Sequence, residues 1–451
     1  MSKLSLFFII TLSIRLFSQE WQFLGLEGES ISAIAVDCSN PNIIYTGSGS
    51  DYSSGRIGGI FKSVDGGAQW DTLIRGVTVR DLDIHPKNGQ IIFATLGINV
   101  LTNNPGIIKS EDGGFTWVRA DSGIRMSWEQ GPIELVIDPH YPDTIYTGTG
   151  GPFGGPPYKS INGGESWFRI DPDSAWLWRE HGIGDSIKVD PLEDGIVSIA
   201  IDPQNTEHLY FGTAGLGEIF ETSDGGNSWN ATGLAANELI YDIQIDPLFP
   251  EKIYAGLSRY GFFMSNDYGK TWLNINEGIT DNSFNLLDIQ LFTKNEITYI
   301  YVRANWGDSS GIYLLNENLI WEQIEISGRR ISTIAIRDSK LYAGSSGLYV
   351  KDLPTTINNP IKHEPNSFAI NIFPNPANST IQVNLKFSKT AYTIIDIFDI
   401  LGRRKETLYR GTLIPGTFRR NFDLSSYSSG VYIINVIMSR EVKNKKVILL
   451  R

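Results

Sequence analysis

The sequence predicts an all-β protein in which a seven-bladed β-propeller is followed by a small C-terminal immunoglobulin-like β-sandwich. Three observations support this prediction. The 451 residues include 46 glycines, and 12% of them are aromatic, which is typical of many short strands joined by tight turns. A unit of four short strands recurs through most of the chain. The last 84 residues, 368–451, hold 13 Lys and Arg but only 5 Asp and Glu, although the whole chain carries a net charge of −12.

Each repeated unit begins with an alternating apolar strand that ends at Asp-Pro or a similar turn. Two more strands follow, and a short motif leads into the fourth. This motif occurs five times, as SVDGGAQW (63–70), SEDGGFTW (110–117), SINGGESW (160–167), TSDGGNSW (222–229) and SNDYGKTW (265–272). Its regular recurrence indicates one structural role repeated around a ring.

Two later units are degenerate. The sixth retains Asn316, Asn318 and Trp321 at the Asp, second-Gly and Trp positions, and the seventh supplies three strands without a tryptophan. The segment EWQFLGLEG, which contains Trp21, fits a fourth strand that follows such a motif. Because closing the ring removes exposed sheet edges, we expect this N-terminal strand to complete the seventh blade.

The motif has the chemistry of a structural turn. An Asp or Asn side chain accepts N–H bonds within its own turn, the second glycine permits a positive φ, and the tryptophan packs between strands or blades. The motif resembles the Asp box, or BNR repeat, of sialidase-like, xyloglucanase-like, sortilin-like and photosystem-assembly-factor-like propellers. The structural Asp-box residues are then Asp65, Asp112, Asn162, Asp224 and Asp267. The resemblance implies a propeller, a fold that hosts both enzymes and binding proteins.

The strand order places the Asp boxes on one face of the ring, the lower face, and the blade-to-blade connections on the upper face. The longest connection covers residues 171–195. The candidate ligand-binding residues lie in upper-face segments and are Trp128, Trp176, Trp178, Trp306, Arg179, Phe153 and Tyr260. Such residues suit sugar rings or the side chains of a protein partner. The alternative is that the tryptophans only pack the long loops onto the ring.

These residues leave three hypotheses for function. The first is a non-enzymatic recognition propeller that binds a glycan or a protein. The second is a secreted glycoside hydrolase with Glu129, Glu180 or Asp185 as catalytic acids, which requires two carboxyl groups about 5–10 Å apart. The third is an assembly factor. No histidine or cysteine cluster has the spacing of a metal site, so neither a metal nor another cofactor is predicted.

The first 18 residues read as a secretory signal peptide, because one lysine precedes a short apolar run. The propeller is then expected at 19–352, with no transmembrane segment in the mature chain. Its acidic charge argues against binding to nucleic acid.

After a Pro- and Asn-rich linker, 353–367, the last segment contains alternating strands. Residues 368–451 resemble the type A C-terminal sorting domain of the type IX secretion system, through PNP (374–376), DILGR (399–403), GVYIINV (430–436) and KKVILLR (445–451). The resemblance implies that the secretion machinery is a partner and that the protein is secreted or held on the outer cell surface.

Overall fold

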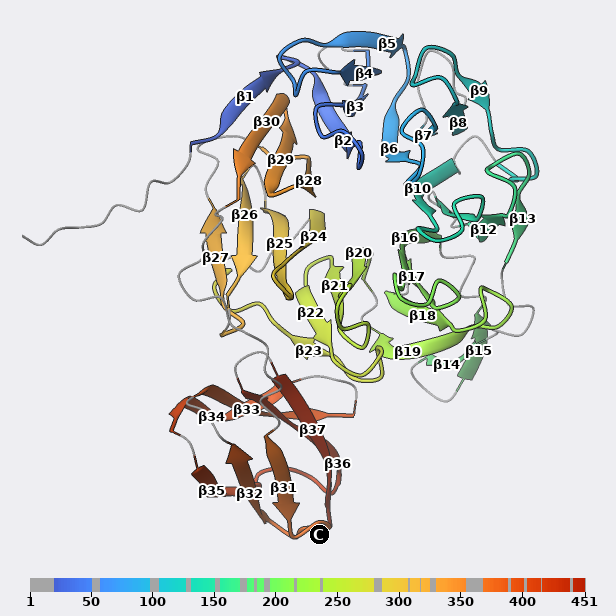
Figure 1. Cartoon of the computed structure of the whole chain (residues 1–451). Helices are drawn as coiled ribbons and strands as arrows, with labels where there is room; N and C mark the ends of the chain where they lie inside the picture. The colour runs from blue at the N-terminus through green and yellow to red at the C-terminus, as the bar shows by residue number, and fades with distance from the viewer. Residues whose placement is uncertain are drawn as a thin grey trace, which may run out of the picture.

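A computed structural model shows the architecture of the chain (Figure 1). It describes residues 20–50, 57–97, 105–126, 131–150, 155–170, 177–181, 185–189, 195–214, 217–235, 238–279, 286–306, 309–316, 318–324, 330–353, 368–387, 391–400, 404–414, 416–438 and 441–450. Every regular element in this part of the chain is a β-strand. The all-β prediction is therefore confirmed.

Seven four-stranded antiparallel sheets, or blades, are found among the described residues of the propeller. The first three consist of β2 (Ser30–Val36), β3 (Ile44–Gly49), β4 (Gly59–Ser63) and β5 (Asp71–Arg75); β6 (Val79–Ile84), β7 (Ile92–Leu96), β8 (Gly106–Ser110) and β9 (Val118–Arg119); and β10 (Gly131–Ile137), β11 (Ile145–Gly150), β12 (Pro157–Ser160) and β13 (Phe168–Arg169).

Blades four to six follow the same plan. They consist of β16 (Ile196–Ile201), β17 (Leu209–Thr213), β18 (Glu218–Thr222) and β19 (Asn230–Ala235); β20 (Ile240–Ile245), β21 (Ile253–Leu257), β22 (Gly261–Ser265) and β23 (Leu273–Asn274); and β24 (Leu286–Lys294), β25 (Ile297–Trp306), β26 (Ser309–Leu315) and β27 (Trp321–Ile324). A separate hairpin of β14 (Leu177–His181) and β15 (Asp185–Val189) lies between blades three and four.

The seventh blade closes the ring. It contains β28 (Thr333–Arg337), β29 (Lys340–Ser345) and β30 (Gly347–Asp352), and β1 (Gln22–Gly25) pairs antiparallel with β30 as the fourth strand. The innermost strands contact one another in the order β2, β6, β10, β16, β20, β24, β28 and back to β2. The N-terminal strand therefore completes the last blade, as predicted (Figure 1).

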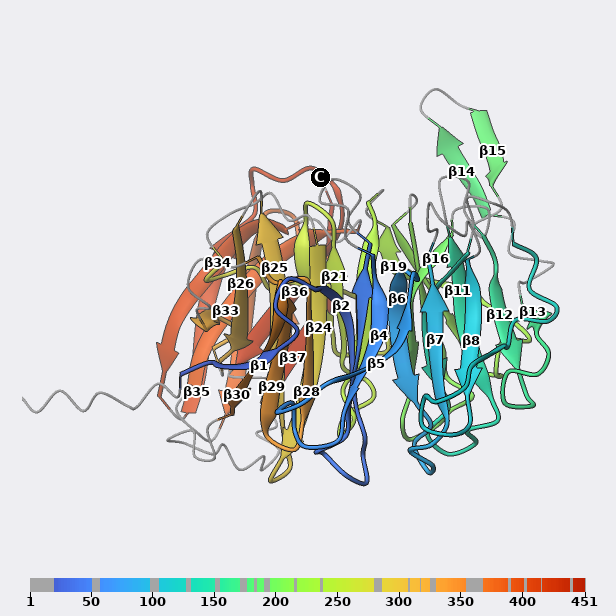
Figure 2. The ribbon, with the colours of Figure 1, turned by 90° about the horizontal axis from the view of Figure 1, so that it is seen from above.

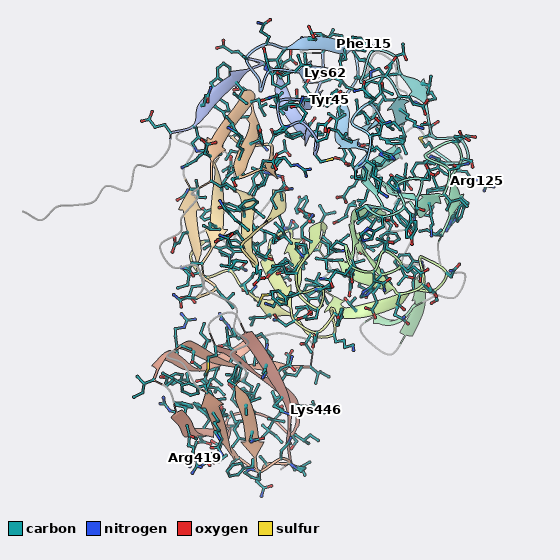
Figure 3. All side chains as sticks on the ribbon, in the orientation of Figure 1. Tyr45, Lys62, Phe115, Arg125, Arg419 and Lys446 are labelled. Atoms are coloured by element: carbon teal, nitrogen blue, oxygen red, sulfur yellow. The ribbon has the colours of Figure 1, made fainter. Side chains whose placement is uncertain are left out.

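The blades are fastened to one another near the lower face. Lys62 of blade one donates from Nζ to the carbonyl of Gly113 in the next blade at 2.8 Å. Its ammonium group also lies 5.3 Å from the ring centres of Tyr45 and Phe115 (Figure 3). Because the lysine is shared between two blades, it joins the core of one blade to the turn of the next.

Four motif tryptophans make a second link between blades. The indole N–H of Trp70 donates to Leu24 O at 2.7 Å, and that of Trp167 donates to Ala120 O at 2.7 Å. Trp229 and Trp321 likewise donate to Ile170 O and Ile275 O. Each acceptor belongs to the neighbouring blade, so these rings bury apolar area and satisfy a carbonyl in one contact.

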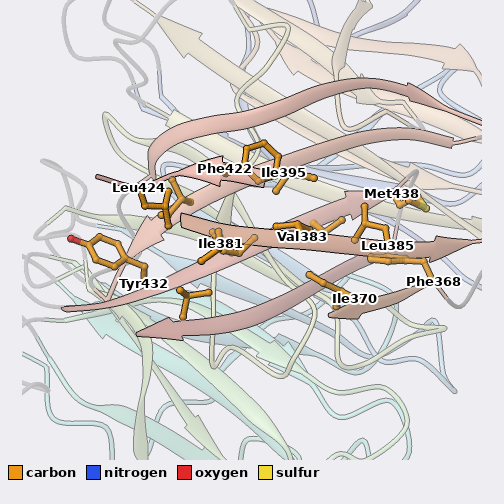
Figure 4. Packing of buried hydrophobic residues seen from close by; sticks show 14 of the residues in the cluster. Phe368, Ile370, Ile381, Val383, Leu385, Ile395, Phe422, Leu424, Tyr432 and Met438 are labelled. Carbon is orange, nitrogen blue, oxygen red and sulfur yellow. The ribbon is translucent and has the colours of Figure 1, made fainter. Parts of the chain in front are cut away.

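The C-terminal domain is a sandwich of two sheets. One consists of β31 (Ala369–Phe373), β32 (Thr380–Phe387) and β35 (Gly416–Asp423), and the other of β33 (Ala391–Asp399), β34 (Arg404–Leu413), β36 (Gly430–Met438) and β37 (Glu441–Leu449). Its core includes Ile381, Val383, Ile395 and Leu424 (Figure 4). The β34–β33–β36–β37 sheet faces the ring, and the other sheet faces away from it (Figure 1).

Candidate functional site

The β14–β15 hairpin is the largest described addition to the upper face. It extends beyond the ends of the neighbouring blades (Figure 2). Its two strands pair from Leu177 with Val189 to His181 with Asp185. The connection that the sequence suggested as one long loop is therefore partly a β-ribbon that stands on the ring.

Two candidate acids lie on this ribbon. Glu180 of β14 pairs with Ser186, and Asp185 of β15 pairs with His181. The acids are thus on neighbouring strands but are not register partners. Trp178 and Arg179 belong to β14 as well. For this hairpin the structure describes the backbone pairing but not the side chains.

The other candidate ligand-binding residues are only partly described. Trp128, Glu129, Phe153 and Trp176 lie outside the described residues, as do the proposed signal peptide and all of the proposed linker except Leu353. Trp306 is the last residue of β25 and pairs with Ser309. Tyr260 lies in the turn between β21 and β22, with 49% of its surface exposed. These residues remain predicted contacts.

The lower face carries the Asp boxes, whose carboxylates are occupied by their own turns. In blade two, Asp112 Oδ1 accepts bonds from Ser110 Oγ and Thr116 N, each at 2.8 Å, and Oδ2 accepts one from Thr116 Oγ1 at 2.6 Å. In blade three, Asn162 Oδ1 accepts bonds from Ser160 Oγ and Ser166 N in the same way. Asp65, Asp224 and Asp267 repeat the bond from the leading hydroxyl.

The box backbone explains the glycines. In blade two, both Gly113 and Gly114 have positive φ, at 75° and 96°. A Cβ on Gly114 would also lie 2.5 Å from Leu73 Cδ1 of the preceding blade. The second position therefore requires glycine both for its conformation and for the close approach of the neighbouring blade.

A second set of acids lines the innermost strands, and the sequence interpretation did not single it out. We call these residues the inner carboxylates: Asp81, Asp83, Glu134, Asp242 and Asp288. Each accepts a backbone N–H bond from the inner strand of the next blade, given by Leu135, Ile137, Ile199, Ile289 and Ile334 respectively. These bonds satisfy N–H groups on strand edges that no further strand covers.

Four of the inner carboxylates, Asp81, Asp83, Glu134 and Asp242, have pKa values raised by burial. Burial raises the pKa of Asp81 to about 6, and burial together with the charge of Asp81 raises that of Asp83 to about 7. Burial and the charges of Asp242 and Asp81 hold the pKa of Glu134 well above its usual range. Arg303 is the nearby cation, with its Nε 3.6 Å from Asp288 Oδ2. Within the described part of the chain, no group of three or more His, Cys, Asp or Glu is arranged to hold a metal ion.

A sequence signal for this set does exist. In three units an acid stands three residues before the last residue of the first strand, in the segments DLDI (81–84), ELVI (134–137) and DIQI (242–245). The acid directly precedes a buried Leu or Ile in its strand, which is an unusual place for a charged residue. Only the three-dimensional arrangement shows that the next blade supplies its partner.

Comparison with known proteins identifies the C-terminal part. Residues 371–450 match the family model described as "Secretion system C-terminal sorting domain". The chain carries a type IX sorting domain. The protein is therefore exported by type IX secretion, to the cell surface or into the medium. The described part of the chain contains no helix that is long and apolar enough to cross a membrane.

The propeller resembles enzymes and a binding protein. Over 263 residues, 56% of this chain, it is 26% identical to an oligoxyloglucan-reducing end-specific xyloglucanase of Emericella nidulans, of which the match spans 27%. A GH74 xyloglucanase of Xanthomonas campestris gives a TM-score of 0.55 at 13% identity, over 94% of this chain and 68% of that one. YCF48 bound to a D1 peptide gives 0.52 at 10% identity, over 76% and 97%. At these identities, the structural likenesses establish the propeller fold alone.

Proposed function

We propose that the propeller is an exported recognition module that binds a β-glucan-type oligosaccharide, such as a xyloglucan fragment, on its upper face. The β14–β15 hairpin carries this proposal, because it adds Trp178, Arg179 and Glu180 to that face outside the seven blades. Aromatic side chains cover the apolar faces of sugar rings, and charged groups hydrogen-bond their hydroxyls. The curated relative named for xyloglucan supports this class of ligand.

Calorimetric titration of the full chain with xyloglucan oligosaccharides tests the proposal. We expect Trp178→Ala to weaken binding at least tenfold. A matched control is Tyr141→Ala, since Tyr141 is 69% exposed in the turn between β10 and β11 on the lower face. Absence of binding to any oligosaccharide in a wider glycan array, or equal losses in both variants, would contradict the proposal.

Hydrolysis is the second candidate function, because the curated relative is named as a xyloglucanase. It would require two of Glu129, Glu180 and Asp185 to act as acid and as base or nucleophile. Product analysis after prolonged incubation separates the two candidates. Turnover that falls at least 100-fold in Glu180→Gln or Asp185→Asn supports hydrolysis, whereas binding without released product supports recognition alone.

A further inference from the structure

The outer face of the β34–β33–β36–β37 sheet packs against the propeller. Along β33 and β36, alternate residues point into the sandwich core, and the intervening residues face the ring. Ile394, Phe398 and Ile437 of the sorting domain belong to one buried cluster with Leu273 and Ile275 of blade five, among others. The sheet is therefore apolar on both faces, and the propeller covers the second one.

A polar row crosses the middle of this docking face. Asp396 pairs with Thr407 on one side and with Asn435 on the other, and Asn435 pairs with Asn444. Asp396 and Asn435 are 2% and 3% exposed, yet the Oδ1 atom of each has no hydrogen-bond partner. Burial raises the pKa of Asp396, although a bond from Thr407 and the charge of Arg404 oppose this rise. Docking therefore carries a cost, because undocking would return these oxygens to water.

The rest of the contact is incompletely packed. Grooves of about 560 Å³ and 310 Å³ lie along the contact, one beside Asn435 and the other beside Asp396. Arg410 Nη1 lies 2.6 Å from Glu277 Oε1, but both side chains are more than a third exposed. Such pairs contribute little to binding. Asn444 Nδ2 adds one bond to Thr271 Oγ1 at 2.7 Å.

We propose that the sorting domain is a reversible latch on blades five and six, and that the covalent connection keeps it docked. Two domains joined by a short tether meet at an effective concentration on the order of millimolar. In the docked state, apolar side chains such as Ile394 and Ile437 contact the ring, and the polar row between them stays unsatisfied. This state is populated at the effective concentration that the tether provides. It is lost when the separated halves are present at micromolar concentrations. The face that includes Ile394, Phe398 and Ile437 is thus hidden in the intact chain and exposed after separation.

The test uses the full chain with a site-specific protease sequence inserted between residues 353 and 368. In a Cys38→Ser background, Glu277→Cys and Arg410→Cys are joined with a short bismaleimide reagent. A control pair combines Arg410→Cys with Arg75→Cys, since Arg75 ends β5 on the far side of the ring (Figure 1). We expect cross-linking of the first pair in the uncut chain and at least tenfold less after cutting at about 1 μM.

Two outcomes would overturn the latch. Equal cross-linking of the two pairs in the uncut chain would show that the docked state is not populated. Halves that remain together on size exclusion at about 1 μM would show that the tether is not required.

The polar row has its own test. Asp396→Leu should make the cut halves associate at least tenfold more tightly, as measured by sedimentation. Asn421→Leu is the matched control, because Asn421 is exposed on β35 of the other sheet and should change nothing. No gain from Asp396→Leu would contradict the role of the polar row.

Discussion

Two sets of acidic side chains recur around the ring, and their environments are opposite. The Asp-box carboxylates lie in exposed turns on the lower face, where hydroxyl and N–H groups surround them. Bonds from Thr116 lower the pKa of Asp112 to about 2, and bonds from Ser228 and Thr222 do the same for Asp224. The inner carboxylates lie between strands, and burial raises the pKa of Asp81 to about 6 and that of Asp83 to about 7.

The difference shows that burial and a neighbouring charge can outweigh hydrogen bonds in deciding whether an acid is charged. Both oxygens of Asp112 are occupied by donors from its own turn, so its charged form is favoured. Asp83 also has a donor at each oxygen, Ile84 N at 2.9 Å and Ile137 N at 3.3 Å, but burial and the nearby charge of Asp81 outweigh these two bonds. Its charged form is therefore disfavoured.

The two sets consequently affect stability in opposite pH ranges. A lowered folded-state pKa stabilises the protein above about pH 4, and this contribution is lost as the pH falls towards 2. A raised folded-state pKa stabilises the protein fully below about pH 4, and this contribution is lost as the pH rises through 6 to 7. The Asp boxes therefore favour neutral pH, and the inner carboxylates favour mildly acidic pH.

The largest expected effect concerns the apolar half of the box. Trp229 is buried, stacks on Phe211 with ring centres 4.2 Å apart, and donates to Ile170 O of the neighbouring blade. Trp229→Ala should lower the free energy of unfolding by about 3–5 kcal/mol, because it leaves a large cavity. Chemical denaturation followed by circular dichroism measures this loss.

The control is an aromatic residue on the same rim. Phe115 is 78% exposed, so Phe115→Ala should change the free energy of unfolding by less than about 1 kcal/mol. If Trp229→Ala cost less stability than removal of the Asp224 carboxylate, the polar half of the box would be the main fastener between blades.

The second prediction concerns the inner set. Asp83→Asn keeps an oxygen that can accept the bond from Ile137 N but removes the titrating charge. Between pH 5 and pH 8, the wild-type protein should lose about 2–3 kcal/mol more stability than the variant, because the folded-state pKa of Asp83 is about 7. Denaturation midpoints measured across this range give the two slopes, and parallel slopes would contradict the raised pKa.

Much of this architecture could be predicted from the sequence. Five boxes at regular spacing, and a strand after Trp21 without a preceding motif, sufficed to predict the ring and its closure by β1. The β14–β15 hairpin also had a signal, because Gly182-Ile183-Gly184 separates two runs that now form its strands. The sequence interpretation gave more weight to the length of the connection than to this signal.

Other features depend on contacts between distant segments. The acids at 81, 83 and 134 are adjacent to their partners only after blades pack side by side. Apolar residues lie on both faces of β33 and β36, which indicates that each face of their sheet is covered by other parts of the protein. Nothing in the sequence shows that blades five and six provide the second cover, because that choice depends on the shape of two finished domains.

A smaller effect is expected from the polar half of the box. Asp224→Ala removes the acceptor for Thr222 Oγ1, Ser228 N and Ser228 Oγ. At pH 7 the midpoint of unfolding should fall, but by less than in Trp229→Ala, because these groups can bond to water instead. The variant should also lose part of the dependence on pH between 4 and 2. Unchanged acid dependence would show that Asp224 titrates normally in the folded protein.

The smallest effect should come from restoring a missing acid. Asn162 occupies the Asp position of the third box, where its Nδ2 donates to Ser166 Oγ at 2.9 Å. In Asn162→Asp the Ser166 hydroxyl can instead donate to the carboxylate, as Ser228 does to Asp224 at 2.6 Å. A charged acceptor forms the stronger bond, so the midpoint at pH 7 should rise slightly, and a new dependence on pH should appear between 4 and 2. Asn371→Asp adds the same charge at an exposed position on β31 and should produce neither change. If both variants behave alike, net charge alone accounts for the gain, and the box geometry does not.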